Sequence, residues 1–577
     1  MPLLHVPRTA RFLLALPLAA MLACASGPVA PPPSPAAIPP RATSPASSSS
    51  TGRSTPALPL PPVPEIDGPL AIKIVYPSPN QQITSRDSNF ILGTVGTGKA
   101  SLTVNGVLAR VYPNGAFIVY VANPAGLASQ YDLVAVRGQD SVRLTLPIRL
   151  ISAAPRRPAV PSSPAPPTKI VATRADSLSV LNARVDSLRA VLARDEPIGV
   201  VQLGAASAVG DTDITVIGRP LPGGTYKWFF TPGTLVPLME RSESFARIRL
   251  DHGLDVWVDA NDARDVPPPT FAPIATQIGA MIPARQVSNM RVRASTQGAD
   301  VIIPMGRPVP YFVEENGHAI TLTLYGVRGN TDIINYASAD SMVSTVEWAQ
   351  DAADRARVTV NLRHAPYGYL VLFERNAMVL KLRGRPAIDA ARPLAGLTIA
   401  VDPGHPPVGS TGPTGLYEPQ ATLPVGEKLK HILEERGATV IMTRTTDAPV
   451  PLGDRPIMAR RANVNAFVSI HYNALPDGVN PFLNPGTGTY FFRTHSEPLA
   501  REVQRGMVAQ IGLQDLGVNY DNLAVVRGTW YPAVLCEGAF IMMPDQEAAM
   551  RNPEFQERYA RGVADGLENY FRSLPSR

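Results

Sequence analysis

The chain has 577 residues, of which 45% are hydrophobic and 17% are charged, so it can form several domains with cores of their own. Its formal net charge is only +6 and it contains no long run of Lys and Arg, which argues against nucleic acid as a partner. Its two cysteines, Cys24 and Cys536, exclude a disulfide framework.

Residues 1–24 have the pattern of an export signal. Arg8 and Arg11 precede a short apolar stretch that ends at Cys24 and is too short to span a membrane. The ending "MLAC" resembles a bacterial lipoprotein signal, which implies cleavage before Cys24 and lipid attachment to its sulfur; an ordinary secretory signal is the alternative. Ala25 is not aspartate. In a cell with two membranes, the resemblance then implies a lipid anchor in the outer membrane, with the protein facing the periplasm.

The next three segments differ in composition. Residues 25–66 are rich in Pro and Ser with few large apolar residues, which predicts a disordered tether. Residues 67–152 contain short β-rich runs separated by Asn-Gly turn signals, which predict an immunoglobulin-like β-sandwich. Residues 153–196 are expected to form a proline-rich linker and a short amphipathic helix, because Leu and Val recur there at spacings of three and four.

Two further β modules follow. Residues 197–268 end in "GLDVWVDANDA" and resemble a small Src-homology-like β-barrel. Residues 269–386 alternate apolar and polar positions in many short runs, such as "AITLTLYGV" and "RVTVNLR". This alternation predicts another small all-β domain.

The period of the apolar pattern changes in residues 387–577. Strand-like runs alternate with helical ones, which predicts an α/β domain with a mostly parallel sheet flanked by helices. The expected strands are residues 397–401, "ATVIMTR", "NAFVSIH", "TGTYFFR", "AVVRG" and "AVLCEG", and the expected helices are residues 423–436, 457–462, 497–511 and 552–571.

Ionisable side chains follow several of these strands. His405 comes after the first strand, His471 ends "AFVSIH", Glu537 ends "AVLCE", and Glu418 lies in a loop after the first strand. Ligands of such sheets bind beyond the carboxyl ends of the strands, so we expect these groups to lie close together. Two histidines and one carboxylate around an open position are typical of a catalytic zinc site, and the remaining carboxylate would act as general base. Either histidine alone would more often be a structural, hydrogen-bonded residue than a metal ligand, and it is the joint placement of all four groups that favours zinc.

A family resemblance covers residues 394–573, about a third of the chain. The motifs "VDPGH", "GLYEPQATL", "TRTTD", "LGDRPIMARRANVNAFVSIHYNA", "GTGTYFFR" and "VVRGTWYPAVLCEGAF" resemble, in this order, those of the zinc-dependent N-acetylmuramoyl-L-alanine amidases. These enzymes cut the amide between muramic acid and the L-alanine of the peptidoglycan stem. The resemblance implies Zn²⁺ as cofactor, His405, Glu418 and His471 as its ligands, and Glu537 as the catalytic residue.

Other positions of the motifs are candidates for binding substrate or supporting the ligands. They are Thr422, Arg444, Arg455 and Asn473. Thr422 departs from the family, which usually has asparagine there.

Further departures occur in two loops. Pro406 and Pro407 stand where the family usually has glycines, and Met543 replaces a usual asparagine. None of these changes removes an expected ligand or the base, so they bear on loop shape and substrate preference.

The position of residues 269–386, directly before this domain, resembles that of the amidase N-terminal (AMIN) domain. The resemblance implies peptidoglycan as substrate, a role in wall remodelling or daughter-cell separation, and an activator from the division machinery as a partner. Two alternatives stay open. One is a non-catalytic peptidoglycan-binding lipoprotein, and the other is a zinc carboxypeptidase that acts on stem peptides.

Overall fold

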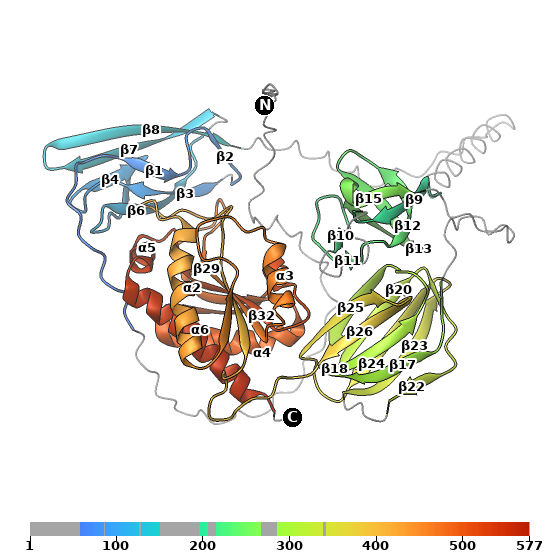
Figure 1. The fold of residues 1–577 in the computed structure, drawn as a ribbon. Helices are drawn as coiled ribbons and strands as arrows, with labels where there is room; N and C mark the ends of the chain where they lie inside the picture. Colours follow the sequence, from blue (N-terminus) through green and yellow to red (C-terminus); the bar gives the residue numbers. More distant parts are fainter. Residues whose placement is uncertain are drawn as a thin grey trace, which may run out of the picture. The chain divides into compact units, whose positions relative to one another are not determined.

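The computed structural model describes residues 58–85, 87–125, 128–150, 196–205, 215–266, 285–337 and 342–575. The expected export signal with Cys24, most of the tether, and the expected linker and amphipathic helix before residue 196 lie outside these ranges. The described residues form three β regions and a C-terminal α/β domain (Figure 1).

The first β region consists of two sheets with one shared core. Their strand orders are β1-β3-β6 and β2-β8-β7-β4-β5. Apolar side chains from both sheets, such as Ile91 and Phe117 from one and Leu102 and Tyr131 from the other, form this core. The strands are β1 Lys73–Tyr76, β2 Gln81–Ile83, β3 Ser88–Thr94, β4 Ser101–Val104, β5 Val107–Ala109, β6 Ala116–Ala122, β7 Ala128–Arg137 and β8 Asp140–Leu150.

The second β region has a five-stranded antiparallel sheet of order β14-β13-β12-β9-β15 and a separate pair, β10 and β11. Trp228 and Phe230 are buried in its core, so these two aromatic side chains serve packing. The strands are β9 Gly199–Leu203, β10 Val216–Gly218, β11 Trp228–Phe230, β12 Leu235–Arg241, β13 Phe245–Asp251, β14 Leu254–Asp259 and β15 Ala263–Val266.

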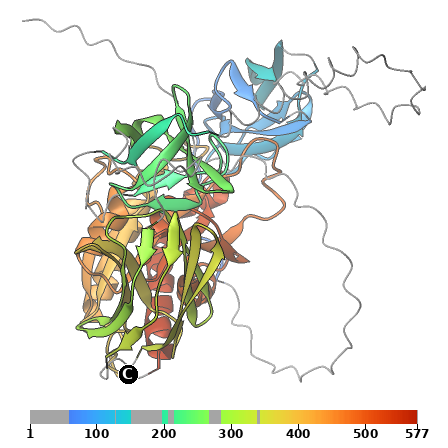
Figure 2. The ribbon, with the colours of Figure 1, turned by 90° about the vertical axis from the view of Figure 1, so that its right-hand side faces the viewer.

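The third β region has two main sheets, of orders β22-β17-β18-β26-β25 and β19-β20-β24-β23 (Figure 2). Alternate residues of both sheets form one core, as the period-2 pattern of the sequence predicts. The strands are β16 Arg285–Val287, β17 Met290–Ser295, β18 Gly298–Pro304, β19 Tyr311–Asn316, β20 Ala319–Tyr325, β21 Val327–Gly329, β22 Ile334–Tyr336, β23 Val343–Ala352, β24 Arg355–Leu362, β25 Gly368–Glu374 and β26 Ala377–Arg383.

The C-terminal domain has a six-stranded sheet of order β28-β27-β29-β32-β30-β31. Its strand pairs are parallel except for β30 with β32. The strands are β27 Thr398–Pro403, β28 Thr439–Met442, β29 Ala466–Asn473, β30 Gly486–Phe491, β31 Gln514–Tyr520 and β32 Ala533–Phe540. The helices are α2 Glu418–Glu435, α3 Asp454–Arg461, α4 Glu497–Ile511, α5 Pro544–Met550 and α6 Pro553–Ser573.

Helices cover both faces of this sheet. One core cluster joins Val468 and Ile470 of β29 to side chains of α2, α4 and α6. The neighbouring Phe467 points to the opposite face, where it packs with residues near α3 and the 3₁₀ helix η4 Ala524–Val526. The strands are therefore apolar on both sides, which is typical of parallel sheets in α/β domains.

Some expected elements differ from those observed. The expected strand "AVVRG" is wrong, because this segment forms η4, where consecutive Val525 and Val526 are both buried. Helix α2 begins at Glu418, five residues before the expected start, with Pro419 in its first turn. Strand β31 and helix α5 were not expected.

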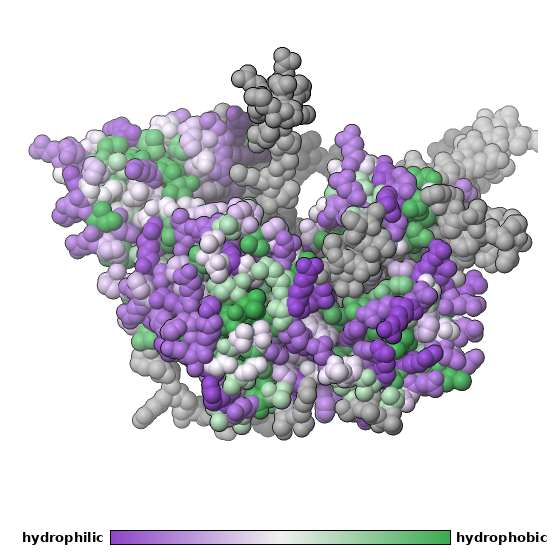
Figure 3. Space-filling view, viewed as in Figure 1, coloured by the Kyte–Doolittle hydropathy of each residue, from purple (hydrophilic) through white to green (hydrophobic). Residues whose placement is uncertain are grey.

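The face of the described residues seen in Figure 3 is mostly hydrophilic, with scattered hydrophobic areas. None of the helices within the described ranges combines the length and apolar character that a membrane crossing requires.

Candidate metal centre and active site

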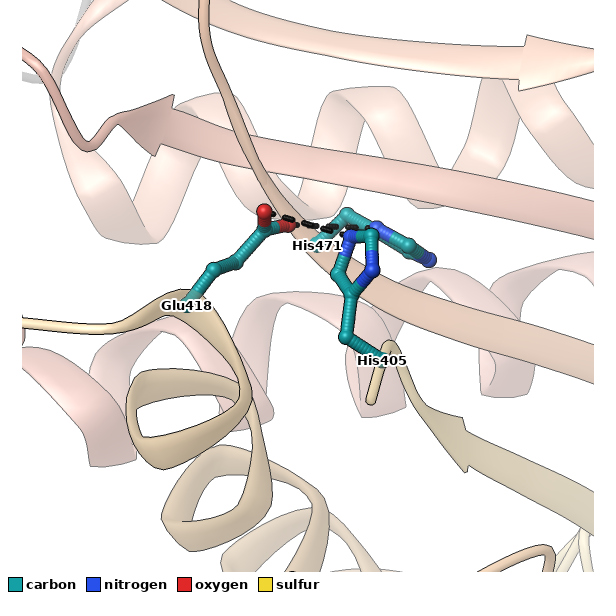
Figure 4. Close-up of side chains that lie close together, drawn as sticks. All are labelled: His405, Glu418 and His471. Carbon is teal, nitrogen blue, oxygen red and sulfur yellow. Dashed lines mark hydrogen bonds and ion pairs between the residues drawn. The ribbon is translucent and has the colours of Figure 1, made fainter. Parts of the chain in front are cut away.

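Three of the expected residues meet at the carboxyl edge of the C-terminal sheet. His405, Glu418 and His471 each offer a ligand atom, and these atoms lie within 4.8 Å of one another. His405 Nε2 is 3.2 Å from Glu418 Oε2, and His471 Nδ1 is 3.2 Å from Glu418 Oε1. The two imidazole rings lie 4.8 Å apart, nearly perpendicular to each other (Figure 4). Sequence reasoning therefore named three residues that the structure brings together.

The Glu418 side chain is almost fully buried and oriented by backbone groups. Its Oε2 accepts a hydrogen bond from the backbone N–H of Ser410 (3.1 Å), and its Oε1 accepts one from that of Tyr472 (3.1 Å). Its own backbone N–H donates to the Ser410 carbonyl (2.9 Å). Glu418 therefore reaches the site from the first turn of α2 in one defined orientation.

The loop after β27 presents His405 at a sharp turn. His405 has a φ of 61°, a left-handed conformation that costs a residue with a Cβ about 1–3 kcal/mol. The preceding Gly404 lies against the His471 ring, and a Cβ at Gly404 would lie 2.4 Å from ring atoms. Only glycine therefore allows the two histidines to approach this closely.

Glu537 lies beside this cluster, on β32. In the parallel pair of β29 and β32, Glu537 is directly opposite His471, so both side chains point to the same face of the sheet. Its Oε2 atom is buried and has no hydrogen-bond partner among the described residues. A buried carboxylate oxygen without a partner is costly in a purely structural role.

The two glutamates have opposite electrostatics. Burial alone would raise the pKa of Glu418, but hydrogen bonds from His405 and His471 outweigh it and hold this pKa well below its usual range. Burial, and then the nearby Glu418 carboxylate, raise the pKa of Glu537 well above its usual value. The two carboxyls therefore differ in their affinity for a proton, which is lowered at Glu418 and raised at Glu537.

The donor set suits a divalent metal ion. Two imidazole nitrogens and a carboxylate oxygen are ligands that zinc prefers, and catalytic zinc sites have three such protein ligands and an open fourth position. Tetrahedral zinc with bonds of 2.0–2.2 Å holds its ligand atoms about 3.3–3.6 Å apart. The two histidine–glutamate separations of 3.2 Å, each to a different oxygen of Glu418, are close to that spacing.

Two buried arginines, Arg455 and Arg444, support the backbone around the metal ligands. Arg455 is fully buried and forms an ion pair with Asp402 (2.7 Å). It also donates to the backbone carbonyls of His405 and Pro406, both at 2.9 Å. Asp402 in turn accepts hydrogen bonds from Thr443, which follows β28, and from Ser469 of β29, so the ion pair connects the backbone around the first ligand to both neighbouring strands.

Arg444 is 4% exposed and likewise contacts backbone carbonyls rather than solvent. Its Nε donates to Pro403 (2.8 Å), and its Nη2 lies within hydrogen-bond distance of Gly404, Pro419 and Thr422. Burial of this kind places Arg444 among the residues that support the ligands.

Tyr490 is a site residue that sequence reasoning missed. Gly488 of β30 is opposite Glu537, so Tyr490, two residues further on, points to the same face. The Asn473 side chain lies beside its phenol. Burial, and then the Glu537 carboxylate, raise the pKa of Tyr490. The alternation of residues within "GTGTYFFR" predicts that Tyr490 shares a face with Gly488. It places Tyr490 beside Glu537 only when the pairing of β30 with β32 is also known.

Comparison with known proteins agrees with this geometry. The family model for N-acetylmuramoyl-L-alanine amidase matches residues 399–569. The YqiI protein of Bacillus subtilis is 30% identical over 198 residues, which cover 33% of this chain and 93% of YqiI. The chain belongs to the N-acetylmuramoyl-L-alanine amidase family. Its match lies within the C-terminal α/β domain, which is called the amidase domain below.

Two other similarities each cover about a third of the chain. A probable cell wall amidase, LytH of Staphylococcus epidermidis, is 34% identical over 188 residues, which cover 32% of this chain. The chain spans 62% of the length of LytH. The crystal structure of an N-acetylmuramoyl-L-alanine amidase from Clostridium difficile is 30% identical, with a TM-score of 0.30, and the match covers 32% of this chain and all of that one.

Proposed function

We propose that this chain is a zinc-dependent peptidoglycan hydrolase that cleaves the amide between N-acetylmuramic acid and the L-alanine of the stem peptide. The observation that carries the proposal is the combination of three ligand donors with Glu537, which lies directly opposite one of them and has a carboxylate oxygen without a partner among the described residues. Family membership supports the choice of substrate.

His405, Glu418 and His471 would hold the zinc ion. When bound, Zn²⁺ supplies a Lewis acid that polarises the scissile carbonyl and acidifies the attacking water. Glu537 takes a proton from that water and later delivers a proton to the nitrogen of L-alanine, the leaving group. The products are a free carboxyl on the lactyl group and a peptide with a free amino terminus.

The test is mass spectrometry of purified sacculi incubated with the full chain and zinc. An amidase releases stem peptides that begin with L-alanine and leaves glycan strands without peptides. A zinc carboxypeptidase would shorten the stems from their carboxyl ends and leave them on the glycan. Unchanged sacculi, with the chain bound to them, would instead indicate a non-catalytic binding protein and overturn the proposal.

We also propose that the chain is exported and anchored by a lipid on Cys24, in the outer membrane facing the periplasm if the cell has two membranes. The support is the basic and apolar sequence before Cys24 and the Pro/Ser-rich segment after it. Among the described residues, the one cluster able to hold a metal lies in the amidase domain. The β regions would accordingly contribute location rather than chemistry, and an activator from the division machinery stays a prediction.

A further inference from the structure

One nitrogen atom of a buried arginine joins the two chain segments that carry His405 and Glu418. Arg444 Nη2 lies 3.0 Å from the carbonyl oxygen of Gly404 and 2.8 Å from that of Pro419. Gly404 directly precedes His405, and Pro419 directly follows Glu418. Each of these contacts is therefore made to the residue next to an expected metal ligand.

Thr422 completes the connection. Its hydroxyl accepts a hydrogen bond from Arg444 Nη2 (2.9 Å) and donates one to the Gly404 carbonyl (2.9 Å). Thr422 is fully buried, one turn along α2 from Glu418. The loop after β27 and the first turn of α2 thus share one hydrogen-bonded junction, formed by Gly404, Pro419, Thr422 and Arg444.

The junction has the properties of a positioning device. A planar guanidinium has several donors in fixed directions, so it can hold several acceptors at set separations, which the ammonium of lysine does less well. Arg444 Nε adds a bond to Pro403, the last residue of β27 (2.8 Å). Its Nη1 donates to the Thr446 carbonyl (3.0 Å) and lies 3.6 Å from the Asp447 carboxylate. Because Arg444 is 4% exposed and all three of its nitrogens have partners, no open face is left for a peptide stem.

We propose that Arg444, through Thr422, sets the separation between His405 and Glu418 and thereby the affinity of the site for its metal. This inference rests on the proposed function only in assuming that the site binds zinc. Arg444 is a positioning residue, since it reaches the donor atoms only through the backbone next to them. Groups that orient metal ligands typically change metal affinity by about 10–100-fold when they are removed.

The experiment measures zinc affinity of the purified full chain by competition with a chromophoric chelator. Arg444→Lys keeps the charge and should weaken zinc binding by about 10–100-fold. Thr422→Val keeps the shape but removes the hydroxyl, and should weaken binding by about tenfold, whereas Thr422→Ser should stay within about threefold of the natural protein. The visible spectrum of the cobalt-substituted protein should change in the first two variants and not in the third.

Arg436→Ala is the matched control. Arg436 caps the far end of α2 and forms ion pairs with Asp565 (2.7 Å) and Glu568 (2.9 Å) of α6, away from the metal ligands. This variant should lower the melting temperature while leaving zinc affinity and the cobalt spectrum unchanged. It separates a loss of general stability from a loss of ligand placement.

The outcomes distinguish the inference from the proposed function. If the natural chain binds no zinc, the proposed metal site fails. If the natural chain binds zinc and Thr422→Val binds it equally tightly with an unchanged cobalt spectrum, the positioning role is refuted. If Arg444→Lys does not fold, the contrast between Thr422→Val and Thr422→Ser decides alone, and equal affinities of these two variants overturn the inference.

Discussion

Replacing Glu537 by glutamine should leave the metal in place and remove most of the turnover. Glu537 is opposite His471 on the adjacent strand, and neighbouring strands lie about 4.8 Å apart. A carboxylate at that separation from a ligand reaches a water molecule in the open position of the site. Glutamine has nearly the same shape, but its amide cannot take a proton from that water.

The expected loss follows from the role of a general base. Proton transfer by a positioned base contributes about 10²–10⁴-fold to rate. This factor corresponds to about 2.7–5.4 kcal/mol of transition-state stabilisation, at 1.36 kcal/mol for each tenfold change. Because His405, Glu418 and His471 supply three ligands without Glu537, the zinc content of Glu537→Gln should equal that of the natural protein.

The assay compares zinc content by plasma emission with the release of peptides that begin with L-alanine. His471→Ala serves as the opposite case, since it should lose zinc and turnover together. Glu557→Gln, on the exposed side of α6, controls for removing a carboxylate outside the site and should be unaffected. Turnover of Glu537→Gln within tenfold of the natural rate would refute the role of base, and loss of its zinc would make Glu537 a ligand.

Three further results are expected. Glu418→Ala should lose zinc as the histidine variants do, and zinc retention measured by plasma emission would remove Glu418 from the ligand set. Burial raises the pKa of Glu547 despite its hydrogen bonds, so the stability from its carboxyl is present below the unfolded pKa and lost as pH rises through the folded pKa. The difference in melting temperature between the natural chain and Glu547→Gln should therefore shrink as the pH rises above the ordinary pKa of glutamate, and a difference that grows contradicts this sign. The Cys24→Ser variant should be lost from the membrane fraction and should keep the size of the unprocessed chain. The same fractionation and the same processed size as the natural chain would exclude the lipid anchor.

The positions of His405, His471 and Glu537 after apolar runs were readable from the sequence. Residues at the carboxyl ends of parallel strands gather at one edge of a sheet wherever the strands pair. The local pattern of apolar residues was sufficient to place β27, β29 and β32, and the ends of these strands follow from it. The prediction that these three residues lie close together therefore required only knowledge of the fold type.

Other features depended on contacts between distant parts of the chain. The "AVVRG" segment looks like a strand, yet it forms η4 because both valines find partners in the core on one face of the sheet. Tyr490 joins the site because β30 runs antiparallel to β32, and strand order is not a local property. From the sequence alone, Arg444 could either bind substrate or support the metal ligands. Only its contacts in the structure favour support of the ligands.

The sequence by itself determined the three expected metal ligands and Glu537, because residue type and strand ends are local properties of the chain. The tertiary structure decided how these side chains are held. The 3.2 Å spacings around Glu418 and the contacts of Arg444 with Gly404 and Pro419 arise only when α2 and the loop after β27 pack together. Hydrogen bonds across such a junction depend on displacements of less than 1 Å, which no pattern of residue types encodes.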